Sequence, residues 1–255
     1  MLLAIDVGNT QTHVGVFSRD EVTAEWRAST QLTATADELA LSFQHFLSLH
    51  DLSFSSQVSG VVISSVVPTL TAGYRDMVER YFHFDPVVVE PGIRTGMPLL
   101  IDNPAELGAD RICNSVAAYA LAGGPLIVID FGTATTFDAI SHKGEYLGGV
   151  IAPGVQISAQ ALTAAAARIP KVELTAPKAV IGKSTVESVR SGVILGAATM
   201  VDGMTDRMRF ELKGEAQVVA TGGLAPMVLE HCTTKARYEP TLTLMGLRLL
   251  YERNV

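Results

Sequence analysis

Hydrophobic and polar positions near the start of the chain follow two patterns that are both typical of β-strands. Residues 2–5 form a continuous apolar run, and residues 12–17 follow a two-residue period. The residues between them are mostly small and polar, and they include Asp6 and Gly8. The pattern predicts a strand, a polar turn and a second strand, with Asp6 at the end of the first strand. Glycine at position 8 permits a tight turn and lets a ligand approach the backbone.

The same pattern recurs in the second half of the chain. Residues 126–140 contain an apolar run that ends at Asp130, followed by Gly132 and several threonines. Asp6 and Asp130 are 124 residues apart in a chain of 255, which indicates an internal duplication. One such turn alone can be an ordinary β-hairpin. Two turns that face each other would offer N–H groups, hydroxyls and carboxylates to a polyphosphate and its cation.

The other apolar segments predict alternating strands and helices. In the first half these are strands at 22–29, 58–67 and 87–89 and helices at 36–49 and 68–84. Their order, β-β-β-α-β-α-β, is that of a ribonuclease-H-like unit. The second half partly repeats it, with strands at 125–131, 134–141, 146–150 and 216–220 and helices near 154–167, 184–209, 224–231 and 241–252. A helix over about 105–122 would carry the chain across, so we expect an α/β fold with two ribonuclease-H-like domains, residues 1–118 and 119–255.

Composition restricts the kind of partner. A net charge of −7 without a cluster of lysines and arginines argues against a nucleic-acid surface, so a small-molecule partner is expected. Asp6 interrupts the first apolar run, and no basic segment precedes it, so no signal peptide is expected. The most apolar stretch, 112–131, is broken by glycine, proline and polar residues and does not predict a membrane span. Cys113 and Cys232 lack metal-ligand spacing, and we expect buried thiols in a reducing cytoplasm.

Residues 103–110 combine signals of structure and of chemistry. Asn103 and Pro104, with Glu106 following, are typical of a helix N-terminus. Asp110 lies within the first two turns of that predicted helix, where the helix dipole stabilises an acidic side chain by about 0.3–1 kcal/mol. From the residues alone, a structural and a chemical role for Asp110 both remain open.

Two further segments resemble ligand-binding loops. Residues 182–185 are similar to the tail of a phosphate-binding P-loop, but position 177 is proline where that motif needs glycine. Ser184 and Glu187 instead predict a capping box at the start of a long helix. Gly222 and Gly223 lie between a predicted strand and a helix, where they allow either a tight turn or a flat ligand close to the backbone.

Five motifs, in this order along the whole chain, closely resemble those of the type III pantothenate kinases. They are Asp-Val-Gly-Asn-Thr at 6–10, Asp-Asn-Pro at 102–104, Gly-Ala-Asp-Arg at 108–111, Asp-Phe-Gly-Thr-Ala-Thr-Thr at 130–136 and Ala-Thr-Gly-Gly-Leu-Ala at 220–225. The likeness extends to Trp26-Arg27 with Thr30, to Gly148-Gly149 with Pro153-Gly154, to residues 182–185 and to residues 242–247.

This resemblance implies a fold and an activity. The fold is that of the acetate and sugar kinase, heat-shock chaperone and actin superfamily of ATPases, in a cytoplasmic homodimer. The activity is the phosphorylation of pantothenate to 4'-phosphopantothenate by ATP with Mg²⁺, which is the first step of coenzyme A biosynthesis. A monovalent cation, K⁺ or NH₄⁺, is implied as well.

The resemblance also assigns roles to residues of this chain. The nucleotide site comprises the phosphate loop and one residue of the second turn: Asp6, Val7, Gly8, Asn9, Thr10, Gln11, Thr12, His13 and Thr133. Asp6 would organise the divalent cation, and Asp130 would bind the monovalent one. The pantothenate contacts are Gly108, Ala109, Asp110, Arg111 and Thr185, the last supplied across the dimer interface.

Phosphoryl transfer explains why the site needs a carboxylate. The transition state is loose and depends on positioning and on neutralising charge. The primary hydroxyl of pantothenate is too weakly acidic to ionise alone, so Asp110 is expected to accept its proton. Arg111 can meet a carboxylate or a phosphate with its planar, charged guanidinium.

The chain departs from the family pattern at two positions. Position 101 is isoleucine where the family often has tyrosine, so a phenolic substrate contact is absent. Position 11 is glutamine where asparagine is usual, which keeps the amide and lengthens its reach.

Two other functions compete with this hypothesis. Another small-molecule kinase of the superfamily would share the two turns but would not need Gly-Ala-Asp-Arg at 108–111. A nonenzymatic regulatory accessory protein would not need Asp6, Asp110 and Asp130 together. The presence of all these residues favours the pantothenate kinase.

Overall fold

The computed structural model describes residues 1–52 and 57–255. These residues form two compact units. The first comprises Met1–Gly96, Asp102–Ala117 and Leu242–Val255, and the second comprises Met97–Ile101 and Ala118–Thr241. The last helix, α7 (Leu242–Asn254), thus groups with the N-terminal part of the chain. Within the described ranges, no helix is both long and apolar enough to cross a membrane.

The first unit contains a mixed five-stranded sheet with the order β3-β2-β1-β4-β5. Strand β1 is antiparallel to β2 and parallel to β4. Before the chain first enters the second unit at Met97, its elements are β1 (Leu2–Val7), β2 (Gln11–Ser18), β3 (Glu21–Ser29), α1 (Ala36–Ser48), β4 (Gly60–Ser65), α2 (Pro68–Phe82) and β5 (Val87–Val88). The predicted order β-β-β-α-β-α-β is confirmed.

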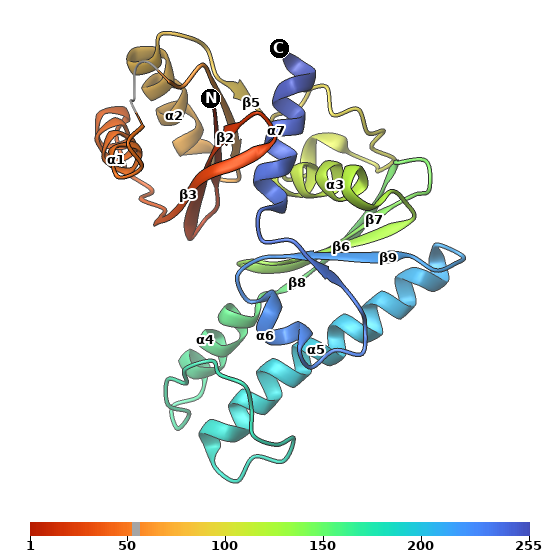
Figure 1. Cartoon of the computed structure of the whole chain (residues 1–255). Coiled ribbons are helices and arrows are strands. Elements are labelled where there is room, and N and C mark those ends of the chain that lie inside the picture. The colour runs from red at the N-terminus through yellow and green to blue at the C-terminus, as the bar shows by residue number, and fades with distance from the viewer. Residues whose placement is uncertain (53–56) are drawn as a thin grey trace. The chain divides into compact units, whose positions relative to one another are not determined.

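Helices cover both faces of this sheet. Leu3, Ile5 and the other core side chains of one face pack with α1 and α2, whereas α7 lies on the opposite face (Figure 1). The approach of α7 is close, because a Cβ at Gly15 of β2 would lie 2.8 Å from a methyl group of Leu244. Strand β1 is therefore buried on both faces, as its continuous apolar run predicts.

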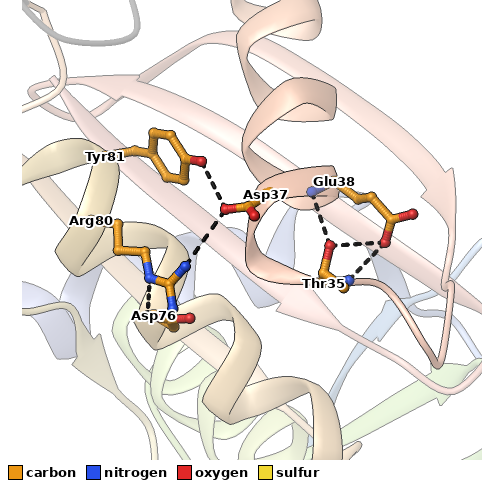
Figure 2. A network of polar contacts seen from close by, with 6 residues as sticks. All are labelled: Thr35, Asp37, Glu38, Asp76, Arg80 and Tyr81. Atoms are coloured by element: carbon orange, nitrogen blue, oxygen red, sulfur yellow. Dashed lines mark hydrogen bonds and ion pairs between the residues drawn. The ribbon is translucent and has the colours of Figure 1, made fainter.

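The start of α1 shows how sequence signals fix a helix end. The Thr35 hydroxyl accepts a hydrogen bond from the Glu38 N–H, and the Glu38 carboxylate accepts one from the Thr35 N–H (Figure 2). This reciprocal pair is a capping box. Next to it, the Asp37 carboxylate accepts a hydrogen bond from the Tyr81 hydroxyl at 2.8 Å and lies 3.7 Å from Arg80, which ties α1 to α2.

The second unit repeats the topology of the first. Its sheet has the order β10-β9-β6-β7-β8, so the strands correspond one to one with β5-β4-β1-β2-β3. Helices α4, α5 and α6 cover one face and share a core with Ile127 and Ile129. The elements are β6 (Leu126–Phe131), β7 (Ala134–Ile140), β8 (Tyr146–Pro153), α4 (Val155–Ala165), α5 (Thr185–Glu211), β9 (Gln217–Thr221), α6 (Ala225–Leu229) and β10 (Arg237–Tyr238). The predicted duplication of the fold is confirmed.

The prediction of one continuous helix over 105–122 is wrong. The Asn103 side chain caps only a single 3₁₀ turn, η1 (Pro104–Glu106). The backbone is extended at Leu107, and a new helix, α3 (Ala109–Ala122), begins after Gly108. Strand β8 also extends to Pro153, beyond the predicted end at 150, and the short strand β10 was not predicted.

Candidate active site

The first polar turn joins β1 to β2 and presents three side chains to solvent. Asn9, Thr10 and Gln11 are exposed, while Asp6 is half-buried. The Gly8 N–H donates a hydrogen bond to the Gln11 carbonyl at 3.0 Å, and a Cβ at position 8 would lie 2.9 Å from that oxygen. The turn is therefore tight enough to favour glycine at position 8, as predicted.

Three other residues of the predicted nucleotide loop have buried side chains. Val7 lies in the core, and the Thr12 hydroxyl lies 3.1 Å from the Thr30 hydroxyl. The His13 ring is buried, with Nε2 3.4 Å from a Glu25 carboxylate oxygen. Burial lowers the pKa of His13 to about 4, with help from the positive charge of Arg27 and against the effect of Glu25. His13 is thus neutral at pH 7. Because the side chains of Val7, Thr12 and His13 are buried, these residues can offer a ligand mainly their backbone groups.

The second polar turn has the same design but is one residue shorter. The Gly132 N–H donates to the Ala134 carbonyl at 3.0 Å, whereas the corresponding bond of the first turn spans one more residue. Asp130 is half-buried at the end of β6, opposite Thr136 on β7, and Thr133 is exposed. The Thr136 hydroxyl is buried and has no hydrogen-bond partner among the described residues. A carboxylate beside an unsatisfied hydroxyl suits a cation that takes oxygen ligands.

Two glycines press directly against the second turn. A Cβ at Gly154 would lie 2.1 Å from the Thr133 carbonyl oxygen, and one at Gly222 would lie 2.6 Å from the Phe131 carbonyl oxygen. Gly222 also has φ +94°, a conformation that side chains disfavour. Both glycine motifs therefore shape this turn through backbone contact.

Asp110 lies at the start of α3 with its carboxylate folded back on the helix. Oδ1 accepts a hydrogen bond from the Arg111 N–H at 2.8 Å. A Cβ at Gly108 would lie 2.5 Å from the same oxygen, so glycine at position 108 makes room for the carboxylate. Burial raises the pKa of Asp110, although the hydrogen bond from the Arg111 N–H and the Arg111 charge oppose the rise. A carboxylate with a raised pKa is a better proton acceptor.

The first turn and the start of α3 belong to the same compact unit. Cys113, one turn after Asp110, is fully buried. Burial raises the pKa of its thiol well above the usual value, and the charges of Asp6 and Asp110 add to the rise. The charges of both carboxylates therefore reach the same thiol. Of the predicted site residues, 6–13 and 108–111 lie in this unit.

Helix α7 holds α3 in place. The Thr243 hydroxyl donates a hydrogen bond to Oδ1 of Asn114 at 2.8 Å, and Asn114 is buried. A Cβ at Gly246 would lie 2.1 Å from the Cys113 carbonyl oxygen, so the two helix backbones almost touch. Thr30, Asn114 and Thr243 are not among the predicted site residues, because sequence order alone does not show which distant side chains meet.

Thr185 belongs to the second unit and is exposed at the N-terminus of α5. The Ser184 hydroxyl accepts from the Glu187 N–H, which is half of the predicted capping box, while the Glu187 carboxylate accepts from Arg190 at 2.9 Å. Thr185 lines a groove of about 600 Å³ between α4 and α5. The groove is mostly apolar, and its lining includes Gly192 and Gly196.

Comparison with known proteins places the chain in a family. The profile of the family described as type III pantothenate kinase matches residues 2–207. A type III pantothenate kinase from Frankia casuarinae is 54% identical over 256 residues, which cover 100% of both chains.

Solved structures with much lower identity share the fold. A conserved protein from Campylobacter jejuni, described as a Baf family transcriptional activator, has a TM-score of 0.63 at 18% identity, covering 99% of this chain and 98% of that one. A protein from Sinorhizobium meliloti, described as a 2-dehydro-3-deoxygalactonokinase, has a TM-score of 0.57 at 14% identity, covering 99% and 96%. These likenesses confirm the predicted fold of two α/β domains. From the family profile and the full-length identity, the chain belongs to the type III pantothenate kinase family.

Proposed function

We propose that this chain transfers the γ-phosphoryl group of ATP to the primary hydroxyl of pantothenate and so forms 4'-phosphopantothenate, the first step of coenzyme A biosynthesis. The chain would act in the cytoplasm. The observation that carries the proposal is that the charges of Asp6 and Asp110 both reach Cys113 in one compact unit of a member of this family. Both carboxylates are half-buried; Asp6 lies next to an exposed turn, and burial raises the pKa of Asp110.

Asp110 is proposed as the proton acceptor. As the alcohol oxygen attacks phosphorus, its O–H bond breaks and the proton passes to the carboxylate. The Arg111 N–H holds Oδ1, which leaves Oδ2 as the oxygen that can accept the proton. Gly108, Ala109 and Arg111 would contact pantothenate around this carboxylate.

The first turn is proposed to bind the phosphates of ATP. Asn9, Thr10 and Gln11 offer exposed amide and hydroxyl groups, and the loop backbone from Asp6 to His13 offers N–H groups. The Asp6 carboxylate is a hard oxygen ligand beside these groups, as Mg²⁺ requires. The bound cation would neutralise charge on the transferred phosphoryl group.

The second turn is proposed to bind a monovalent cation, K⁺ or NH₄⁺, at Asp130. The half-buried carboxylate and the unsatisfied Thr136 hydroxyl supply oxygen ligands from one sheet face. Thr133, exposed at the tip of the same turn, would contact ATP.

A homodimer is proposed to form through the α4–α5 groove. Leu162, which lines the groove, is 39% exposed. Val180 and Ile181 are 76% and 82% exposed and lie beside α5, since the Ser191 hydroxyl donates to the Val180 carbonyl. Exposed apolar surface of this kind is typical of an interface. Thr185, which also lines the groove, would then reach pantothenate across the interface.

Release of ADP in a coupled assay tests the proposed activity. Three reactions contain the protein, ATP and Mg²⁺ with pantothenate, with a panel of sugars, or with no acceptor. We expect ADP release only with pantothenate. Release with a sugar would indicate another small-molecule kinase, and no release with any acceptor would support a nonenzymatic accessory role.

The same assay in K⁺ and Na⁺ buffers tests the role of Asp130. We expect activity to rise with K⁺ or NH₄⁺ and to stay low in Na⁺ alone. The Asp130→Asn variant should lose this dependence together with most of its activity. Activity that is indifferent to the cation would contradict the assignment.

A further inference from the structure

We propose that Thr30 is a positioning residue for the nucleotide loop, because its hydroxyl holds the Gly8 carbonyl inward and so directs the following loop N–H group towards the ligand. The inference rests on the proposed role of residues 6–13 in binding ATP. Thr30 itself need not touch the nucleotide.

Thr30 follows β3 directly and binds the loop at two points. Its hydroxyl donates a hydrogen bond to the Gly8 carbonyl at 2.7 Å, and its N–H donates to the Thr10 carbonyl at 3.0 Å. In a planar trans peptide, the C=O and the following N–H point in opposite directions. Fixing the Gly8 carbonyl towards Thr30 therefore turns the Asn9 N–H away from Thr30. The exposed tip of the loop at Asn9 is where a phosphate oxygen would need that donor.

The Thr12 hydroxyl extends this contact into a relay. The Thr12 and Thr30 hydroxyl oxygens are 3.1 Å apart. A carbonyl only accepts, so the single proton of Thr30 is committed to Gly8. Thr12 must then donate to Thr30. The Thr12 hydroxyl polarises that of Thr30, which strengthens the bond to Gly8.

The relay is shielded on one side. Thr12 is 4% exposed and Thr30 is half-buried, so water has little access to the bond between them. Thr12 also lies near Tyr74 on α2, which is 3% exposed, so the relay connects the loop to the core on the α2 side of the sheet. A loop held in this way has its N–H groups oriented before ATP arrives, which reduces the entropy lost on binding.

The second turn shows that the fold itself does not require this relay. By strand register, Thr30 corresponds to Gly154, because Gln11 pairs with Ser29 and Ala134 pairs with Pro153. Gly154 has no side chain, and its backbone lies in close contact with the backbone of the turn. Thr135 corresponds to Thr12, yet its buried hydroxyl has no partner among the described residues. Two turns of one topology thus differ at the positions of Thr30 and Thr12, because the corresponding Gly154 has no hydroxyl and the Thr135 hydroxyl has no partner among the described residues.

Steady-state kinetics of Thr30→Val and Thr30→Ser test the inference. Valine keeps the shape and removes the hydroxyl, so we expect kcat/KM for ATP to fall about tenfold or more, as for loss of a buried hydrogen bond. The KM for pantothenate should change by less than about twofold, since Thr30 does not act on that substrate. Serine keeps the hydroxyl and should restore kcat/KM for ATP to within about threefold of wild type.

Thr23→Val is the matched control. Thr23 lies on β3, the strand that Thr30 follows, and its hydroxyl donates to the Val16 carbonyl at 3.1 Å, away from the loop. This variant loses the same type of bond and should leave the kinetics for ATP unchanged. The relay also predicts that Thr12→Val combined with Thr30→Val is no worse than Thr30→Val alone, because Thr12 acts through Thr30.

Three results would overturn the proposal. They are an unchanged kcat/KM for ATP in Thr30→Val, an equal loss in Thr23→Val, or equal losses for ATP and pantothenate. Asp6→Asn separates this failure from that of the proposed function. If Asp6→Asn also leaves the kinetics for ATP unchanged, the assignment of residues 6–13 fails; if it abolishes activity while Thr30→Val does not, only the positioning role of Thr30 fails.

Discussion

At the scale of single residues, Asp110 combines chemical use with a cost in stability. Burial raises the pKa of its carboxyl above the ordinary value of 3.8. Between the ordinary and the raised pKa, the folded protein holds more protons than the unfolded chain. The free energy of unfolding therefore falls as pH rises through this window, and the loss is complete above the raised pKa. Ionised Asp110 at neutral pH is less favourable for folding than a neutral side chain would be.

This argument predicts two opposite effects of Asp110→Asn. Turnover should fall by about 10²–10⁴-fold, since the general base is lost. Thermal unfolding at pH 7 should shift upwards by about 2–5 °C, because the buried charge is removed while Asn can still accept from the Arg111 N–H. The shift should shrink as pH falls below the ordinary carboxyl pKa, where Asp110 is neutral in both states.

Asp85→Asn provides the control, because Asp85 is an exposed carboxylate in the same unit. It should change neither turnover nor Tm. Near-normal turnover of Asp110→Asn would remove Asp110 as the base, and a lower Tm would contradict the stated cost of its burial.

At the scale of elements, the contact between α7 and α3 depends on glycine at position 246, which has no side chain. The Gly246 Cα lies against the backbone of Cys113, three residues after Asp110. Backbone atoms cannot move aside as the end of a long side chain can. The position of Asp110 is therefore linked to the C-terminal helix, far away in sequence.

Gly246→Ala should destabilise the protein by about 1–3 kcal/mol through overpacking, despite the better helix propensity of alanine. It should also lower kcat, because α3 must shift to make room. Urea unfolding and the ADP-release assay measure the two effects. Gly73→Ala in α2 is the control, since its Cβ would meet only ordinary contacts at 3.7 and 3.8 Å. It should be neutral or stabilising by about 0.5–1 kcal/mol, and equal stability of the two variants would refute the packing argument.

At the scale of the whole molecule, the proposed homodimer rests on the α4–α5 groove. Gly192 is exposed in the groove, and a Cβ there would meet nothing within 4 Å. A large side chain at this position would fit the single chain and obstruct a partner. One substitution at Gly192 can therefore prevent assembly of the dimer without disturbing the fold of the single chain.

Light scattering on a sizing column should give wild type twice the mass of one chain. Gly192→Arg should give the mass of one chain with an unchanged circular dichroism spectrum, and lower activity if Thr185 acts across the interface. Phe210→Arg is the control, because Phe210 is 87% exposed on α5 and does not line the groove. An unchanged mass for Gly192→Arg would exclude this groove as the interface.

Much of the fold could be predicted because its signals are local. The apolar runs and the two-residue periods identified the strands, and the spacing of Asp6 and Asp130 revealed the duplication. The family motifs marked the residues at both turns and at the start of α3. The helix over 105–122 was wrong because Asn103 and Pro104 start a helix without determining its length, and the extended Leu107 ends it after one turn.

The sequence by itself determined the succession of elements, the two acidic turns and the family. Each of these depends on neighbouring residues or on ordered motifs. Only the tertiary structure decided that Thr30 binds the Gly8 carbonyl, that Gly246 meets the backbone of Cys113, and that Asp6 and Asp110 act on one thiol. The physical reason is that these contacts join residues far apart in the chain, and only the packing of helices against sheets brings them within hydrogen-bond or van der Waals distance.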